Sequence, residues 1–313
     1  MDLTRLWPQI VARAQKACDR PGWDWRLKRW KFIARAWLTP RLTRRWFAVL
    51  DRPELAPLVG QRPRLFGKLQ RPYLHRSLRP AGRLKILEDH YEFVASRISP
   101  AALAAIAARD GLLLCESVFE DLGPVRLRML YTDKFEKEGE LTVGIYAQEP
   151  PRLVTAASFT ILRGSGSGWE IFIGGLQANH KADQRELIRD VTKAIFGLRP
   201  KAFALWSVQI IASAWKIPLI RGVGDTQHVY RHFQNRKDLS ASYDEFWRES
   251  EGTPDACGFF VLPSRFTPRL AEELKPNKRR LYQRRYDLLT SLACQVRASL
   301  LKAAPTAGKN GEV

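Results

Sequence analysis

Two adjacent glycines followed by polar side chains form the first stretch of this chain whose residue types suit chemistry. The segment GGLQANH contains Gly174, Gly175, Gln177, Asn179 and His180. Glycines at the end of a strand let another group approach the backbone closely. Polar groups at such junctions often bind ligands. We therefore predict a polar ligand pocket here, and the alternative is a β-bulge followed by a helix cap.

A second candidate is the segment GDTQHVYRH, which holds Asp225, His228, Tyr230 and His232. The pKa of histidine lies near neutrality, so His228 is suited to be a general base or to hydrogen-bond a substrate. We group Asp225 with it as catalytic and expect Tyr230 to contact substrate. His228 and His232 are four residues apart and could share a metal with Asp225, but no further ligand is defined, so we predict no metal site. The alternative is a helix cap followed by structural histidines.

Three carboxylates stand close together in the segment KFEKEGELTVG, at Glu136, Glu138 and Glu140. A cluster of charges before a strand is usually a solvated turn, because charged side chains are rarely buried. The competing hypothesis is that Glu138 is a catalytic carboxylate that takes up a proton during the reaction.

Two cations follow the GGLQANH segment, on either side of a helix break at Pro200. Lys193 and Arg199 either pair with an anionic head group or phosphate, or solvate the end of a helix.

Runs of apolar residues predict the elements that position these side chains. Five segments between residues 112 and 175 are typical of successive strands: LLLCESVFE, VRLRMLYTD, ELTVGIYAQ, RLVTAASFTIL and WEIFIGG. RGSGSG joins the last two as a hairpin turn. A helical stretch follows from Asp183 to about Trp215. IPLIRGVG and CGFFVLP then predict two more strands, and DTQHVYRHF and SYDEFWRE predict helical pieces. This order predicts an α+β core over residues 111–265.

Residues 1–110 are predicted to be a basic, Trp- and Arg-rich helical region, with an irregular connection over residues 51–82. The segment WRLKRWKFIARAWL predicts a helix flanked by Lys and Arg. One stripe of that helix carries Leu27, Trp30, Ala34, Trp37 and Leu38. Such a stripe packs on the protein's own core in one interpretation, and binds the interface of an anionic membrane in the other.

Positive charge is concentrated at the two ends of the 313-residue chain. The net charge is +20, of which residues 1–90 carry +14 and residues 261–313 carry +7, so the middle is nearly neutral at −1. This distribution suggests an anionic lipid surface or nucleic acid as partner. In the predicted C-terminal helical arm, residues 266–303, Tyr282 and Tyr286 alternate with basic residues, but no nucleic-acid-binding motif accompanies them, so nucleic acid ranks third. Residues 304–313 are predicted to be a disordered tail.

Cysteine spacing and hydropathy limit the class of protein. The four cysteines lie far apart, which argues against a zinc site and a disulfide framework. The first residues lack the apolar core of a signal peptide. The longest apolar run, AFALWSVQIIASAW, is about 14 residues and too short to span a bilayer. We therefore expect a cytoplasmic protein, with peripheral association at the inner membrane as an extension of that expectation.

Six segments in one order resemble the VirK/YbjX family of bacterial proteins, also called DUF535. They are GGLQ, TKAIFGLRPK, GVGDTQHVYR, YDEFWRE, FFVLP and KPNKRRLYQRRYDLL. The resemblance covers about residues 25–289 and is strongest over residues 139–287. It implies a link to virulence, envelope integrity and resistance to cationic antimicrobial peptides, and it carries over no catalytic residue.

The order of elements is also similar to the core of GNAT-type acyltransferases. In that fold a strand–turn–helix junction binds the pyrophosphate of the acyl carrier through backbone N–H groups at a helix N-terminus. The corresponding segment here is GGLQANHKADQ. The Gln/Arg-x-x-Gly-x-Gly/Ala loop of that superfamily is absent, and Asp183 would put negative charge near the phosphate. The acyl donor therefore stays open between acyl-CoA and an acyl-carrier protein.

Three functions are expected in order. The first is an enzyme that transfers an acyl group to an amine or hydroxyl of a peptide or lipid, with His228 or Glu138 taking the acceptor's proton and Lys193 and Arg199 binding anionic parts. The second is a non-catalytic envelope factor that binds anionic lipid through the Trp/Arg helix. The third is a nucleic-acid-binding protein.

Overall fold

The computed structural model describes residues 3–164, 166, 168–178, 182–232 and 242–305. Within these residues, eight strands form one sheet in the order β1-β2-β3-β4-β5-β6-β8-β7. The strands are β1 Leu112–Phe119, β2 Gly123–Leu130, β3 Leu141–Ala147, β4 Arg152–Arg163, β5 Trp169–Ala178, β6 Leu219–Val223, β7 Thr253–Pro254 and β8 Phe259–Leu262. All neighbours are antiparallel except β5 and β6. The predicted α+β class is confirmed, and the seven predicted strands are β1 to β6 and β8.

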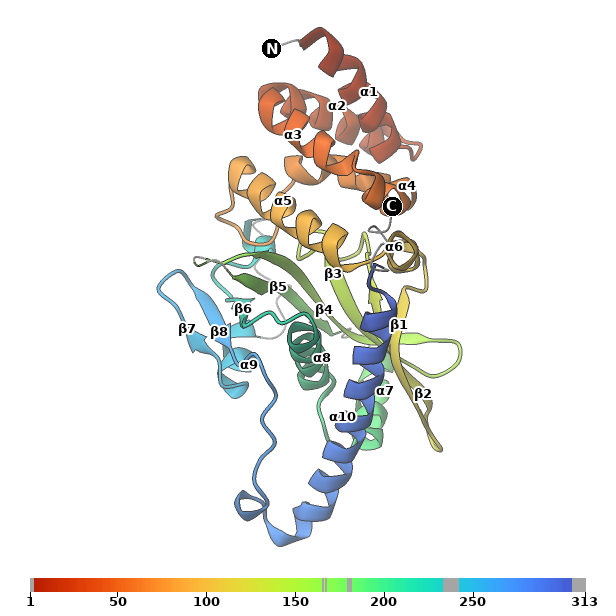
Figure 1. The fold of residues 1–313 in the computed structure, drawn as a ribbon, viewed down its shortest axis with the longest axis vertical. Coiled ribbons are helices and arrows are strands. Elements are labelled where there is room, and N and C mark those ends of the chain that lie inside the picture. Colours follow the sequence, from red (N-terminus) through yellow and green to blue (C-terminus); the bar gives the residue numbers. More distant parts are fainter. Residues whose placement is uncertain (1–2, 165, 167, 179–181, 233–241, 306–313) are drawn as a thin grey trace, which may run out of the picture.

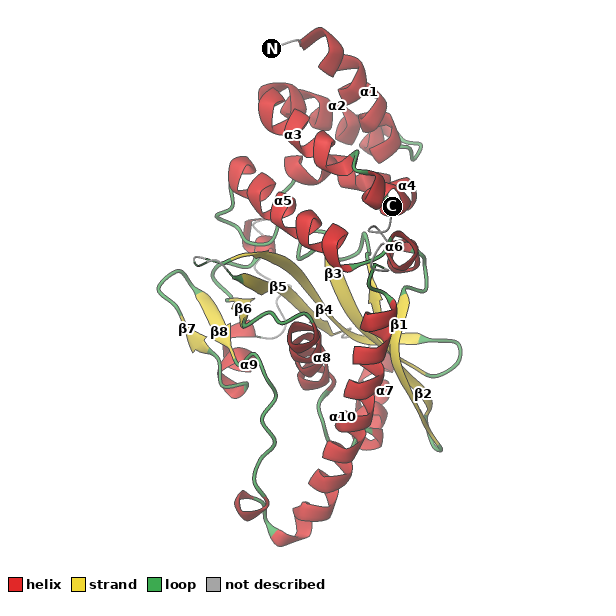
Figure 2. Cartoon of the chain, in the orientation of Figure 1, coloured by secondary structure: helices red, strands yellow, loops and turns green. Residues whose placement is uncertain are grey.

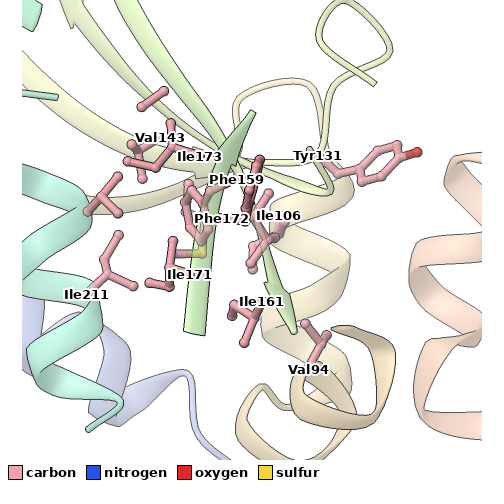
Figure 3. Packing of buried hydrophobic residues seen from close by; sticks show 14 of the residues in the cluster. Val94, Ile106, Tyr131, Val143, Phe159, Ile161, Ile171, Phe172, Ile173 and Ile211 are labelled. Atoms are coloured by element: carbon pink, nitrogen blue, oxygen red, sulfur yellow. The ribbon is translucent and has the colours of Figure 1, made fainter. Parts of the chain in front are cut away.

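The centre of the sheet is buried on both faces. In β4 eight consecutive residues are buried, because α5 (Pro80–Arg97) and α8 (Pro200–Ala214) both pack against this strand. The two helices lie on opposite sides of the sheet (Figure 1). Figure 3 shows the resulting core, in which Val94 of α5 and Ile211 of α8 approach apolar side chains of β4 and β5. Continuous apolar runs such as these are what a strand covered on both faces requires.

A layer of helices precedes the sheet in the chain and covers one side of it (Figure 2). Its elements are α1 Leu3–Ala17, α2 Trp23–Leu38, α3 Pro40–Leu50, η1 Pro53–Leu55, α4 Ala56–Gln61, η2 Pro63–Gln70, α5 and α6 Pro100–Ala107. The predicted irregular connection over residues 51–82 is therefore a series of short helical pieces, several of which begin at a proline. The indole of Trp46 donates to the carbonyl of Leu65 at 3.1 Å, so even this irregular part is fixed by buried contacts.

The apolar stripe predicted on α2 faces solvent. Trp30 is 65% exposed and Leu38 78%, and Leu27, Ala34 and Trp37 are exposed as well. The opposite face of the helix is the buried one, and it carries Phe32, Ile33 and Ala36. Of the two interpretations of the stripe, packing on the protein's own core is therefore wrong.

Three further helices complete the described chain around the sheet. They are α7 Ala182–Ala194, α9 Tyr243–Glu249 and α10 Pro276–Lys302, with a short η4 at Ala271–Glu273. The basic arm forms α10, which runs along β1 and α8 (Figure 1). Arg285 donates to the carbonyl of Phe196 through Nε at 3.0 Å and Nη2 at 2.6 Å, which holds the arm on its own protein. None of the helices in the described part of the chain has the length and apolarity needed to cross a bilayer.

The single parallel pair in this sheet separates where the candidate residues lie. β5 and β6 pair only from Glu170 to Ile173, and the rest of β5 is paired with β4 alone. The segment after β6 was predicted to be a helix beginning at Asp225, and this prediction is wrong. A bridge between His75 and His228 and a short η3 (Val229–His232) occupy that segment instead. This non-local pairing fixes the backbone in a form that a regular helix cannot adopt.

Candidate active site

Glu138 lies at the centre of a buried polar cluster where β5 and β6 separate. Its side chain is fully buried. The loop that carries it is held by two backbone hydrogen bonds, from the N–H of Glu138 to the carbonyl of Phe135 at 2.8 Å and from the N–H of Leu74 to the carbonyl of Lys137 at 2.7 Å. A buried carboxyl held so firmly needs specific surroundings, because burial of a charge is costly.

The glycine pair of β5 makes room for Glu138. A Cβ at Gly175 would lie 2.2 Å from Oε2 of Glu138, and a Cβ at Gly174 would lie 2.1 Å from the Glu138 carbonyl oxygen. The prediction that another group approaches these glycines closely is therefore correct in its geometry. The approaching group belongs to this chain, and it is a carboxyl that could do chemistry.

Two side chains face Oε1 of Glu138. Nε2 of Gln177 donates to it at 2.5 Å, and Nε2 of His228 lies 3.6 Å away. Among the described residues, no donor bonds Oε2. Burial raises the pKa of Glu138 to about 8, against the lowering effect of the Gln177 hydrogen bond. At pH 7 the carboxyl is therefore neutral in roughly nine molecules of ten.

His228 is fully buried, and its ring is fixed on both sides. It stacks on Tyr243 with ring centroids 4.8 Å apart and planes 26° apart. Its Nδ1 accepts the backbone N–H of Tyr230 at 3.4 Å. A neutral ring with Nδ1 as acceptor carries its proton on Nε2, the atom that faces Glu138. The pair Glu138–His228 can therefore hold and exchange a proton.

Two tyrosines close the cluster. The hydroxyl of Tyr243 accepts the N–H of Leu176 at 3.2 Å and lies 3.4 Å from Nε2 of Gln177. The ring of Tyr230 is 5.5 Å from that of His228. Burial raises the pKa of Tyr230 to about 12, with a smaller contribution from the charges of Glu138 and Glu136. Tyr243 was not predicted from the sequence, although its position at the start of the predicted helix SYDEFWRE marks it as a residue that a cap would fix.

Asp225 has a different position from the one predicted. Its carboxylate accepts the N–H of Tyr243 at 2.8 Å and the hydroxyl of Ser242 at 2.7 Å, so it caps the first turn of α9. Its own N–H donates to Asp244 at 2.7 Å. The geometry gives Asp225 the role of positioning Tyr243 rather than of contacting a reacting group.

A cavity of about 490 Å³ adjoins the cluster through α9. Ser242 lines it, and the next residue is the Tyr243 that stacks on His228. Arg199 and Lys201 also line it, and burial lowers the pKa of Lys201. Arg199 forms an exposed ion pair with Glu249 at 3.0 Å. Lys193 is exposed in the last turn of α7 and is not among the lining residues.

Some of the predicted residues cannot be placed. Asn179 and His180 lie outside the described residues, and so does the side chain of His232. In the described part of the chain, no group of three or more His, Cys, Asp or Glu side chains is arranged to hold a metal ion.

The prediction of a solvated turn for the three glutamates is wrong, because all three are buried. Glu140 pairs with Nζ of Lys68 at 2.8 Å and accepts the hydroxyl of Tyr91 at 2.6 Å. Glu136 accepts hydrogen bonds from Arg64 at 2.5 Å and Arg71 at 2.8 Å. Basic residues from η2 and the residue that follows it thus compensate two of the three carboxylates. Glu138 has no such cation, and this difference sets it apart chemically.

The sequence was compared with known proteins. The family model "Protein of unknown function (DUF535)" matches residues 21–298. The chain is 29% identical over 293 residues to the Escherichia coli K12 "Uncharacterized protein YbjX", which covers 92% of this chain and 88% of that protein. It is 28% identical over 214 residues to an "Uncharacterized protein" of Haemophilus influenzae, covering 68% of this chain and 70% of that protein.

Proposed function

The chain belongs to the DUF535 family, and we propose that it is an acyltransferase that uses Glu138 as its general base. One observation carries this proposal. A fully buried carboxyl with a pKa of about 8 stands between Gln177 and His228, at the point where two parallel strands separate. Carboxyls with a pKa near the working pH are efficient proton-transfer groups.

The topology supports the choice of acyl transfer among the reactions that a general base serves. An antiparallel meander leads into β5, then come α7, the parallel strand β6 and the helix α9. This order is similar to that of GNAT-type acyltransferase cores. The carboxyl ends of adjacent parallel strands are a common place for ligands. The similarity is one of fold, so the site residues have to support the chemistry by themselves.

The proposed step uses an acyl thioester as donor and an amine or hydroxyl of a peptide or lipid as acceptor. The acceptor's nitrogen or oxygen forms a bond to the carbonyl carbon, and the carbon–sulfur bond breaks. The acceptor's proton passes to ionised Glu138, and the departing thiolate takes up a proton to become a thiol. His228 faces the carboxyl and can relay the proton. Because the ionised carboxyl is the base, the rate should rise with pH up to about 8.

The test is release of free thiol from acyl-CoA and acyl-carrier-protein donors, in the presence of amine and hydroxyl acceptors. Glu138→Gln keeps the hydrogen bond from Gln177 but removes the base, so we expect a loss of about 100-fold or more. Glu186→Gln, an exposed glutamate on α7, is the matched control and should keep full activity. Equal activity of Glu138→Gln and wild type would refute the assignment, as would the lack of thiol release with both donor classes.

A second candidate function rests on a different observation, the solvent-exposed stripe of α2. Trp23 is 75% exposed, Trp30 65% and Trp37 46%, and basic residues flank them. Tryptophan next to Lys and Arg is typical of helices that lie in the interface of anionic membranes. We propose on this basis that α2 binds an anionic lipid surface, where a lipid acceptor would also be found.

Vesicle flotation separates this second candidate from acyl transfer. The double variant Trp30→Ser/Trp37→Ser should lose binding to phosphatidylglycerol vesicles without loss of folding stability, because both side chains are exposed. Val118→Ser, 70% exposed on β1, is the matched control and should bind as wild type does. Retained flotation of the double variant would remove α2 as the membrane contact.

A further inference from the structure

A cavity of about 400 Å³ lies between α2, η2 and the loop that leads into β3. Six basic side chains and one carboxylate line it. They are Lys28, Lys31, Arg35, Arg64, Arg71, Lys137 and Glu136. None of them belongs to the buried cluster of Glu138, Gln177, His228, Tyr230 and Tyr243. The cavity therefore has a charge pattern and a composition that acyl transfer at Glu138 does not explain.

The positive charge of this cavity exceeds what its acidic neighbours balance. Glu136 receives both Arg64, at 2.5 Å, and Arg71, at 2.8 Å. Arg64 also lies 3.6 Å from Asp133. Burial lowers the pKa of Lys137, and the charges of Arg71 and Arg64 lower it further against the opposing effect of Glu136. A cation whose protonation is disfavoured by its cationic neighbours indicates a region of positive potential.

The α2 side of the cavity adds cations without acidic partners. Lys28 and Lys31 form no ion pair with any acidic group among the described residues, and Arg35 donates to the neutral carbonyl of Gln70 at 3.0 Å. Spacings of three and four residues place Lys28, Lys31 and Arg35 on one face of the helix. That face adjoins the exposed tryptophan stripe, because both belong to the same helix and are separated by about a quarter turn.

We propose that this cavity binds a phosphate monoester or diphosphate group. Such a group carries close to two negative charges and several acceptor oxygens, which matches a concave site with excess cations. Arginine binds it through two parallel hydrogen bonds, and lysine acts as a point charge. The position beside the tryptophan stripe favours a lipid head group as the source, with a soluble phosphorylated molecule as the other source. The site does not depend on Glu138 and stands even where acyl transfer fails.

Calorimetric titration with inorganic pyrophosphate at low salt tests the site directly. Lys28→Ala/Lys31→Ala should weaken binding by about tenfold or more, which corresponds to about 1.4 kcal/mol. Arg41→Ala/Arg44→Ala removes the same charge from exposed positions of the neighbouring α3 and should change affinity less than about twofold. Both variants alter exposed side chains, and matching thermal unfolding curves will show that they are folded. Absence of pyrophosphate binding, or equal weakening by the two variants, overturns the proposal.

Vesicles distinguish the two sources of phosphate. Phosphatidic acid presents a phosphate monoester, whereas phosphatidylglycerol presents a diester of similar surface charge. Preference for phosphatidic acid in phosphatidylcholine vesicles, with competition by pyrophosphate, identifies a lipid head group. Pyrophosphate binding without vesicle binding identifies a soluble ligand, and both results support the site. Displacement of pyrophosphate by a single-stranded oligonucleotide at equal phosphate concentration would make this a nucleic-acid surface and overturn the proposal.

Discussion

Gly175 lies directly beneath the carboxyl of Glu138, so closely that a single added carbon at residue 175 would stand 2.2 Å from Oε2. The same carbon would stand 2.4 Å from Cδ and 2.9 Å from Cβ of the glutamate. The absence of a side chain on β5 is therefore the condition under which a glutamate can be buried at this point of the sheet. It also makes the two residues energetically dependent on each other.

Gly175→Ala should destabilise the protein by about 1–3 kcal/mol, because the new methyl group overlaps a buried side chain with nowhere to move. In the background of Glu138→Ala, most of this cost should disappear, since the overlapping carboxyl is gone. Urea denaturation of both single variants and the double variant gives the coupling energy. Gly60→Ala, where a Cβ meets nothing within 4 Å, is the control and should not destabilise. Additive effects of the two substitutions would contradict the contact.

The pH dependence of stability should reveal Glu138. Its pKa rises from an ordinary value of 4.5 to about 8 on folding, so the native state holds a proton that the unfolded chain releases. The stabilisation is complete below pH 4.5 and is lost as the pH rises through 8. Near pH 7 the free energy of unfolding should fall by up to about 1.4 kcal/mol per pH unit from this group.

The same measurement on Glu138→Gln supplies the control for this pH effect. The amide does not titrate, so the curve of the variant should be flatter between pH 6.5 and 8.5 in this estimate. Burial lowers the pKa of His75 and His90 to about 4, so both rings are neutral in either state above pH 7 and do not interfere. Parallel curves for wild type and variant would show that Glu138 is ionised in the native state.

Tyr243→Phe should cost about 1–3 kcal/mol, because it leaves the buried N–H of Leu176 without its acceptor. Hydrogen exchange of the Leu176 amide should become faster in this variant. Tyr286→Phe is the matched control. Its hydroxyl accepts the exposed N–H of Arg269 at 2.9 Å, and water can replace it at a cost of less than about 0.5 kcal/mol. Equal costs for the two variants would argue against a buried role for the Tyr243 hydroxyl.

Lys68→Met should destabilise the protein by about 3–5 kcal/mol, because Glu140 would remain as a buried charge without its cation. The double variant Lys68→Met/Glu140→Gln should lose less, because it removes both charges together. Arg199→Ala, which breaks an exposed pair with Glu249, should cost less than about 1 kcal/mol. Thermal and urea unfolding measure all three, and a double variant less stable than Lys68→Met would contradict this account.

The sequence predicts the sheet well because each strand shows its burial in its own residues. β4 and β5 are continuous apolar runs, and the structure covers them on both faces. The helix expected at Asp225 is wrong for the opposite reason. That segment is shaped by the bridge from His228 to His75, a residue far away in the chain, and local periodicity carries no record of such a contact.

The candidate site could be predicted only in part. The adjacent glycines indicate a close approach to the backbone, and this is correct, but nothing local identifies Glu138 as the group that approaches. The three glutamates read as a solvated turn because their compensating cations, Lys68, Arg64 and Arg71, belong to an earlier part of the chain. Their alternation at every second residue was the available signal, since it places all three on one side of an extended backbone.

The docking of α10 on β1 has a consequence for how this chain is made. β1 is a terminal strand of the sheet, and two side chains of α10 satisfy its outward backbone groups. Gln295 accepts the N–H of Glu116 at 3.1 Å, and Ser299 donates to the carbonyl of Leu113 at 2.8 Å. Since α10 leaves the ribosome last, a nascent or prematurely terminated chain presents this strand uncovered, as a template for intermolecular β-pairing. The final helix thus acts as an internal guard against aggregation during synthesis.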